Sequence, residues 1–134
     1  MTLSWKSLSV AALVYAMPVA AQSAQFPGTP QGKLAAGFFA AVNSSDEEAL
    51  AAFQDANFSE AALKRRPREQ RVALGKQLRE QAGTLTLKEI KSSSATQLVA
   101  TATGSNLAPG SMITFSFTFT GNGTPKIDAV QITS

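Results

Sequence analysis

Between residues 30 and 82 the apolar side chains recur at the spacing of α-helices, and three helices account for them. The first helix follows Thr29-Pro30, because threonine is a favoured N-cap and proline is a favoured first helical residue. Its apolar stripe has the spacing i, i+4 and i+8, and consists of Leu34, Phe38 and Val42. Asn43-Ser44 is predicted to end it.

The second and third helices are predicted from their end signals. The second starts at Ser45-Asp46-Glu47-Glu48, whose first and last residues have the spacing of a capping box with serine as the cap. Ser59 is predicted to cap a further short turn. The third helix begins at Pro67 and ends at Gly83, a residue type that often terminates helices.

After residue 83 the apolar period changes from about 3.6 to 2, which predicts strands. In the clearest strand, residues 112–120, one face is polar and the other carries Ile113, Phe115, Phe117 and Phe119. Three further segments are predicted as strands: 84–88, 97–103 and 127–132. Ile127 and Val130 fall on opposite parities, which predicts a bulge in the last strand. The chain is therefore predicted to be α+β, with about three N-terminal helices packed on one face of a four-stranded antiparallel meander.

The first 21 residues have the three-part order of a secretory signal peptide. One lysine precedes a mostly apolar stretch, residues 8–17, and the small residues of Val19-Ala20-Ala21 suit a cleavage site. The apolar stretch is too short to cross a bilayer, which takes about 20 apolar residues. We expect cleavage after Ala21 and export to the periplasm or the extracellular space, with no transmembrane segment afterwards. Residues 22–29 are predicted to form a flexible tether, and residues 30–134 a single domain.

Composition narrows the chemistry that the exported chain can perform. The sequence has no Cys and no His, and cleavage removes Trp5 and Tyr15, the only residues of their types. Disulfides and thiolate metal sites are excluded, and acid–base catalysis is left to carboxylates or lysine. Loss of Lys6 leaves a net charge of +2, one unit below the +3 of the whole chain, which is too weak a basic balance to indicate nucleic acid. We expect no cofactor, no metal, no nucleic-acid partner and no enzymatic activity.

One segment carries a resemblance to a known family. Phe38-Phe39-Ala40-Ala41-Val42-Asn43-Ser44-Ser45-Asp46, followed by an alanine-rich helix, resembles the beginning of many domains with the cystatin-like roll of the nuclear transport factor two fold. The run from Gly32 to about Thr103 is also similar to a small domain of exported bacterial proteins. The resemblance implies helices packed into the concave face of a curved meander. Enzymes of this fold, such as ketosteroid isomerase, pair an acidic base with a tyrosine or acidic donor, and no catalytic residue carries over to this chain.

Two sets of side chains are candidates for binding. The first would edge an apolar cavity if the sheet curves strongly, although a core of this size also needs such residues: Phe38, Phe53, Phe115 and Phe117. The second is a basic segment that would dock an anionic surface, although short charge runs are commonly solvated: Lys64, Arg65, Arg66, Arg68 and Arg71.

The remaining polar candidates have simpler explanations. The acidic residues 46–48 suit a helix start, where they complement the helix dipole. Asp128 is predicted to be a solvated strand residue near Lys126. Asn43, Asn57 and Asn122 stand in glycosylation motifs that matter only in a glycosylating secretory pathway.

The sequence predicts an exported non-catalytic module that binds an apolar small molecule or a protein partner. Pairing through the polar sheet face or a strand edge would make it a homodimer. Two alternatives stay open. One is a small enzyme on the same fold that uses a buried carboxylate on an apolar substrate. The other is a peripheral binder of an anionic surface through residues 64–71.

Overall fold

The computed structural model describes residues 24–121 and 123–134, so the predicted signal peptide and Asn122 lie outside the described residues. Within the described part, four helices come first: α2 (Pro30–Asn43), α3 (Glu47–Asn57), α4 (Glu60–Arg65) and α5 (Arg68–Ala82). Four strands follow: β2 (Leu85–Ser93), β3 (Gln97–Gly104), β4 (Ile113–Phe119) and β5 (Ile127–Thr133). The predicted α+β class is confirmed.

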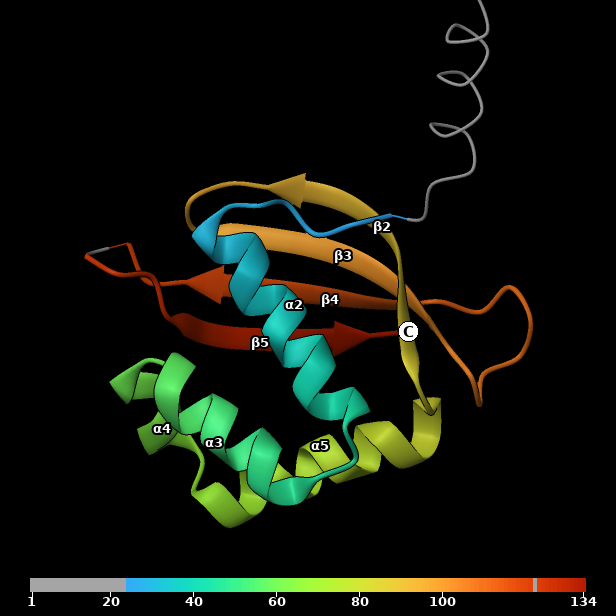
Figure 1. Cartoon of the computed structure of the whole chain (residues 1–134), viewed down its shortest axis with the longest axis horizontal. Helices are drawn as coiled ribbons and strands as arrows, with labels where there is room; N and C mark the ends of the chain where they lie inside the picture. Colours follow the sequence, from blue (N-terminus) through green and yellow to red (C-terminus); the bar gives the residue numbers. More distant parts are fainter. Residues whose placement is uncertain (1–23, 122) are drawn as a thin grey trace, which may run out of the picture.

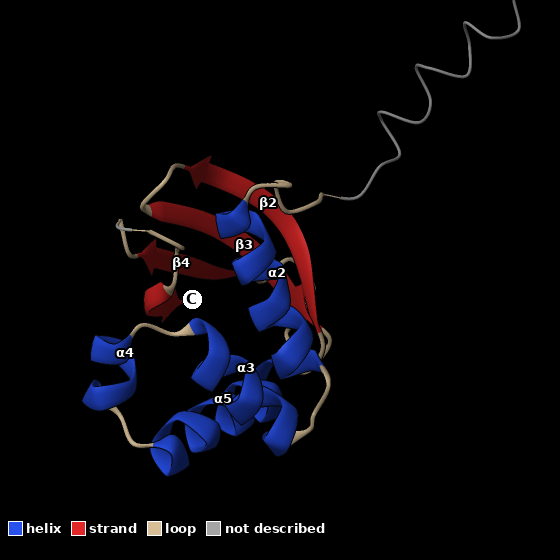
Figure 2. Cartoon of the chain, turned by 60° about the vertical axis from the view of Figure 1, so that its left-hand side comes forward, coloured by secondary structure: helices blue, strands red, loops and turns tan. Residues whose placement is uncertain are grey.

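The strands form one antiparallel meander in the order β2-β3-β4-β5, as predicted. Figure 2 shows the sheet curving around α2, which lies across its inner face. The helices α3, α4 and α5 gather on the side of the edge strand β5 (Figure 1). The curvature of the sheet accompanies two register shifts between β2 and β3, because bulges bend and twist a strand.

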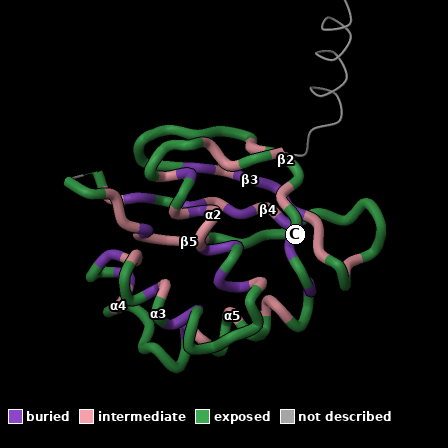
Figure 3. Tube along the Cα trace, viewed as in Figure 1, coloured by how far each residue is buried: buried purple, intermediate pink, exposed green. Residues whose placement is uncertain are grey.

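The core lies between α2 and the middle of the sheet, where the buried residues concentrate (Figure 3). Along β4 the alternate residues from Ile113 to Phe119 are buried, as the pattern of period 2 predicts. The ring of Phe39 packs on Phe115 at 4.9 Å between centroids, and the ring of Phe38 packs edge-on to Phe117 at 5.6 Å. Aromatic side chains from the first helix and the third strand therefore join the two layers.

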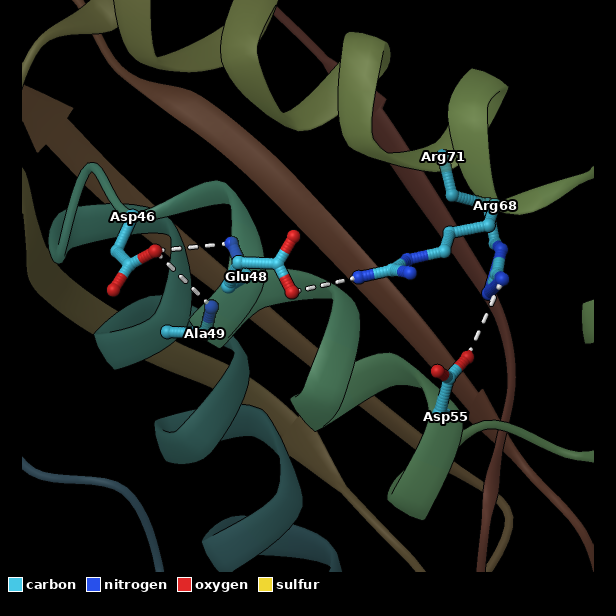
Figure 4. Close-up of polar contacts among 6 residues, drawn as sticks. All are labelled: Asp46, Glu48, Ala49, Asp55, Arg68 and Arg71. Carbon is cyan, nitrogen blue, oxygen red and sulfur yellow. Dashed lines mark hydrogen bonds and ion pairs between the residues drawn. The ribbon is translucent and has the colours of Figure 1, made fainter.

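The helix starts agree with the predictions at α2 and α4 and differ at α3. The side chains of Thr29 and Ser59 accept hydrogen bonds from the first turns of α2 and α4. The prediction that Ser45 caps the next helix is wrong, because Ser45 has a φ of 60° and stands in a turn before the helix. Asp46 is the cap, and its Oδ1 accepts from the backbone N–H of Glu48 at 3.0 Å and of Ala49 at 3.4 Å (Figure 4).

The predicted bulge in the last strand is confirmed. The pairing of β4 with β5 passes from Thr118 opposite Ala129 to Phe119 opposite Ile127, which leaves Asp128 as the extra residue. A bulge redirects the side chain at that point. The carboxylate of Asp128 accepts a hydrogen bond of 2.6 Å from the hydroxyl of Ser59 at the start of α4. The bulge thus ties the edge strand to the helices beside it.

Candidate functional site

A groove of about 480 Å³ lies between β5 and the helices α3, α4 and α5. We call it the β5 groove. Five consecutive β5 residues, 128–132, run along it. Its volume falls within the range of about 300 to 1,000 Å³ that is typical of small-molecule sites. The groove is therefore large enough for a small organic ligand.

Apolar side chains form most of the wall of the β5 groove. Those of α5 are Leu74 and Leu78, and those of β5 are Val130 and Ile132. Among the described residues, three large apolar side chains are exposed, and two of them, Leu74 and Ile132, line this groove with 42% of each exposed. Exposed apolar surface that is gathered in one concave place is typical of a binding site, whereas single scattered residues are not.

Arg71 is a buried cation in the wall of the groove. Its side chain is only 8% exposed, and its Nη2 donates to Oδ1 of Asp55 at 3.4 Å (Figure 4). That distance is long for a charged hydrogen bond, and Asp55 is itself 57% exposed, so water screens much of its charge. The Nε and Nη1 atoms of Arg71 are buried without a hydrogen-bond partner among the described residues. Arg71 therefore has donors that the described fold does not use.

Gln54 adds a second unpaired polar group to the same wall. Its side chain is 4% exposed, and its Oε1 is buried without a hydrogen-bond partner among the described residues. Buried polar atoms are paired in the great majority of cases, so the exceptions at two residues of one groove need an explanation, as does Oγ1 of Thr101, which is also unpaired but lies outside the groove. A water molecule, an ion or a ligand supplies the missing partner in such places.

Three further charged residues, Arg65, Arg66 and Asp128, line the groove. Arg65 donates from Nη2 to the backbone carbonyl of Asp128 and lies 3.7 Å from its carboxylate. The side chain of Asp128 is 37% exposed, so it is a partly solvated strand residue. Its carboxylate also accepts from Ser59, because the bulge turns it toward α4, and Lys126 donates instead to the carbonyl of Ala56. The three lining arginines outnumber the one lining carboxylate, which leaves the groove cationic.

The predicted apolar set divides between the groove and the core. Phe38 lines the groove. The ring of Phe53 packs edge-on to the ring of Phe38, at 6.4 Å between centroids. Phe115 and Phe117 have no exposed surface, belong to the core and do not line the groove. Sequence reasoning did not single out Leu74 and the groove side of β5 as a binding surface. The signal that could have indicated this surface was the composition of α5, which is rich in charged residues and has few large apolar residues on one face.

The predicted basic set also divides. Arg65, Arg66 and Arg71 line the groove, while Lys64 and Arg68 do not. Lys64 lies 3.7 Å from Glu60, and Arg68 lies 3.0 Å from Glu48 (Figure 4). These contacts with carboxylates of the same chain reduce the bare positive charge available to a membrane or another anionic surface. Contact with such a surface stays a prediction.

The described residues hold neither of two other kinds of site, a metal-binding cluster or a membrane-spanning helix. Residues 24–121 and 123–134 contain no group of three or more metal-ligating side chains placed to hold an ion. In the same residues no helix combines the length and the apolar character that a membrane span requires.

Comparison of the chain with protein-family models, with curated proteins and with solved structures found no match. The predicted likeness to the cystatin-like roll therefore stays a prediction, and the function has to be argued from the groove.

Proposed function

We propose that this chain is an exported, non-catalytic binding module of the cystatin-like roll type that takes a small ligand in the β5 groove. The observation that carries the proposal is the groove itself, about 480 Å³ in volume and walled by Leu74, Leu78, Val130 and Ile132. A concave apolar wall with a few polar groups is the usual form of a small-molecule site. The curvature of the sheet around α2 supports the roll (Figure 2).

Binding is favoured over catalysis by the state of the carboxylates. The buried polar and charged side chains of the described residues are Gln54, Ser59, Arg71 and Thr101, and no carboxylate is among them. An acid–base enzyme without His or Cys would need a carboxylate or a lysine whose pKa burial shifts toward neutrality. The carboxylate that lines the groove, that of Asp128, is held by Ser59 and Arg65. Among the described residues, the lack of a buried carboxylate or lysine supports binding over the alternative of a small enzyme.

Polar substitutions in the apolar wall test the site. Leu74→Gln and Ile132→Gln remove apolar surface from opposite sides of the groove, α5 and β5. Burying such a side chain against a ligand contributes about 1.5 kcal/mol or more, so we expect each variant to bind about tenfold more weakly. The measurement is titration with N-phenyl-1-naphthylamine, a neutral apolar dye whose fluorescence rises on binding.

Met112→Gln is the matched control. Met112 is 45% exposed, close to the 42% of Leu74 and Ile132, but it lies outside the groove. It should leave dye binding unchanged. Equal weakening by all three substitutions would mean that the dye reports general surface hydrophobicity, and the absence of dye binding to the unaltered protein would overturn the proposed function.

Export is a separate part of the proposal and rests on the pattern of the first 21 residues. We expect the protein recovered from the periplasm or the medium of a bacterial host to have lost these residues and to begin at Gln22. The intact mass of the purified protein measures this. An unprocessed mass in the cytoplasmic fraction would remove export from the proposal.

A further inference from the structure

We propose that the ligand of the β5 groove is an amphiphile with an anionic head group, a carboxylate or a phosphate monoester. The head group would pair with Arg71, and the apolar part would lie against Leu74, Leu78 and Ile132. This inference rests on the proposed function and adds the charge and shape of the ligand to it.

The buried guanidinium of Arg71 is the first argument. Taking a cation out of water is costly unless a counter-charge and hydrogen bonds replace its hydration. Here Asp55 supplies one long contact to Nη2, and the donors on Nε and Nη1 have no partner among the described residues. An oxyanion accepts two hydrogen bonds at once from one edge of a guanidinium, here from Nε or Nη1 together with the remaining N–H of Nη2, so one head group supplies a partner for one of the two donors. Carboxylates and phosphates therefore match what Arg71 lacks.

Gln54 is the second argument, because its amide suits the same head group. Its Oε1 has no partner among the described residues, so no hydrogen bond to that oxygen determines which way round the amide lies. A rotation of the amide by 180° exchanges Oε1 with Nε2 at little cost. In that orientation Gln54 donates to an anionic oxygen beside Arg71, and in the other it accepts from a hydroxyl group of a ligand.

The order of residues along α5 is the third argument. Arg71, Leu74 and Leu78 stand at positions i, i+3 and i+7, so they form one stripe along the helix. The cation is at the start of the stripe, and the apolar residues extend for about 10 Å beyond it. Opposite this stripe, Val130 and Ile132 continue the apolar wall on β5. A charged end followed by an apolar strip matches a single-chain amphiphile.

The charges around the groove are the fourth argument. Arg65 and Arg66 also line it, and Asp128 is the carboxylate among the lining residues. An anion is attracted by this surplus, while a cation of the same shape is repelled. The groove should therefore distinguish amphiphiles by the sign of the head group as well as by the tail.

Four ligands with the same ten-carbon chain test the inference: decanoate, decyl phosphate, 1-decanol and decylammonium. Each competes with the neutral dye N-phenyl-1-naphthylamine for the full-length exported protein. We expect decanoate or decyl phosphate to bind at least tenfold more tightly than 1-decanol, and decylammonium to bind most weakly. Comparison of the two anions shows whether the site favours a carboxylate or a phosphate.

Arg71→Met is the decisive variant, because methionine keeps an unbranched side chain of similar bulk but has no charge. It should lower the affinity for the favoured anion at least tenfold and leave 1-decanol binding unchanged. Arg68→Met is the matched control on the same helix, since Arg68 pairs with Glu48 and lies outside the groove. Arg71→Lys keeps the charge but loses the two-pronged geometry. Its affinity for the favoured anion should therefore lie between that of the unaltered protein and that of Arg71→Met. An unfolding curve for each variant confirms that it is folded.

The outcomes separate the two proposals. The head-group inference is overturned if 1-decanol competes as well as both anions do and Arg71→Met changes the affinity for none of the three. The groove would then remain a binding site. If the dye does not bind the unaltered protein, the proposed function fails and this inference fails with it. Binding to phosphatidylglycerol vesicles that is lost in Arg65→Ala/Arg66→Ala but retained in Arg71→Met would assign the charges to a membrane surface, and would overturn the inference.

Discussion

Replacing Phe115 by alanine is expected to lower the free energy of unfolding by about 3 to 5 kcal/mol, as is usual for a buried phenylalanine. Phe115 has no exposed surface and lies at the centre of the layer between α2 and the sheet. Its ring packs on Phe39 at 4.9 Å and lies 6.5 Å from that of Phe38. The substitution removes these contacts and leaves a cavity that the surrounding rings cannot fill. Urea unfolding followed by far-UV circular dichroism measures the loss.

Thr114→Ala is the control for this prediction. Thr114 is on the same strand as Phe115, next to it in sequence and on the opposite face of the sheet. Its substitution should cost less than about 1 kcal/mol, because little apolar surface is lost. Small domains are stable by only about 5 to 15 kcal/mol, so Phe115→Ala removes a large part of the total. Similar losses in both variants would contradict the placement of Phe115 at the centre of the core.

The elements of the fold could be predicted because their signals are local. The Thr29-Pro30 start of α2, the cap at Ser59 and the end of α5 at Gly83 each depend on a few neighbouring residues. The bulge at Asp128 followed from the parity of the apolar positions on either side of it. Ser45 was assigned the wrong role because serine and aspartate are equally good caps, and the left-handed turn at Ser45 decides between them.

The groove could not be predicted, because it depends on which elements meet in space. Periodicity identifies the apolar face of α5 but not the element that covers it. Leu74 and Ile132 lie far apart in sequence, and they share the groove because α4 contacts β5 and holds the helices at that edge of the sheet. Phe115 and Phe117 are on the most apolar strand and are entirely enclosed. The strongest hydrophobic signal in the sequence therefore marks the core, and a weaker one marks the site.

Arg71 shows how charge in a sequence can be misassigned. In the linear sequence it is the last member of a basic segment and belongs with its neighbours. On the helix it stands three and seven residues before Leu74 and Leu78 and lines the groove with them, whereas Arg68, three residues before it, pairs with Glu48 outside the groove. Helical spacing alone does not separate the two arginines, because Arg71 is three residues from Arg68 and three from Leu74. The burial of Arg71 in the groove wall, which depends on tertiary packing, distinguishes it.

Replacing Arg71 by methionine is expected to raise the free energy of unfolding of the ligand-free protein by about 1 to 3 kcal/mol. Methionine leaves no buried charge and no unpaired donor, whereas the guanidinium leaves Nε and Nη1 without partners among the described residues. Loss of the contact with Asp55 costs little, because Asp55 is more than half exposed. Urea unfolding in the absence of amphiphiles measures the difference, with Arg68→Met as a control that should change stability by less than about 1 kcal/mol.

A bound anionic amphiphile should reverse this difference in the free energy of unfolding, so that the unaltered protein becomes more stable than Arg71→Met. A ligand that binds only the folded state adds RT ln(1 + [L]/Kd) to stability, about 2.7 kcal/mol at 100 times Kd, and Arg71→Met would receive little of it. At saturating decanoate or decyl phosphate the unaltered protein should therefore become the more stable of the two. A structural role for Arg71 predicts instead that the substitution destabilises the protein with or without ligand. An unpaired buried cation destabilises the folded protein when no ligand is bound. If Arg71→Met is therefore the more stable protein without ligand and the less stable one with it, Arg71 serves the ligand rather than the core.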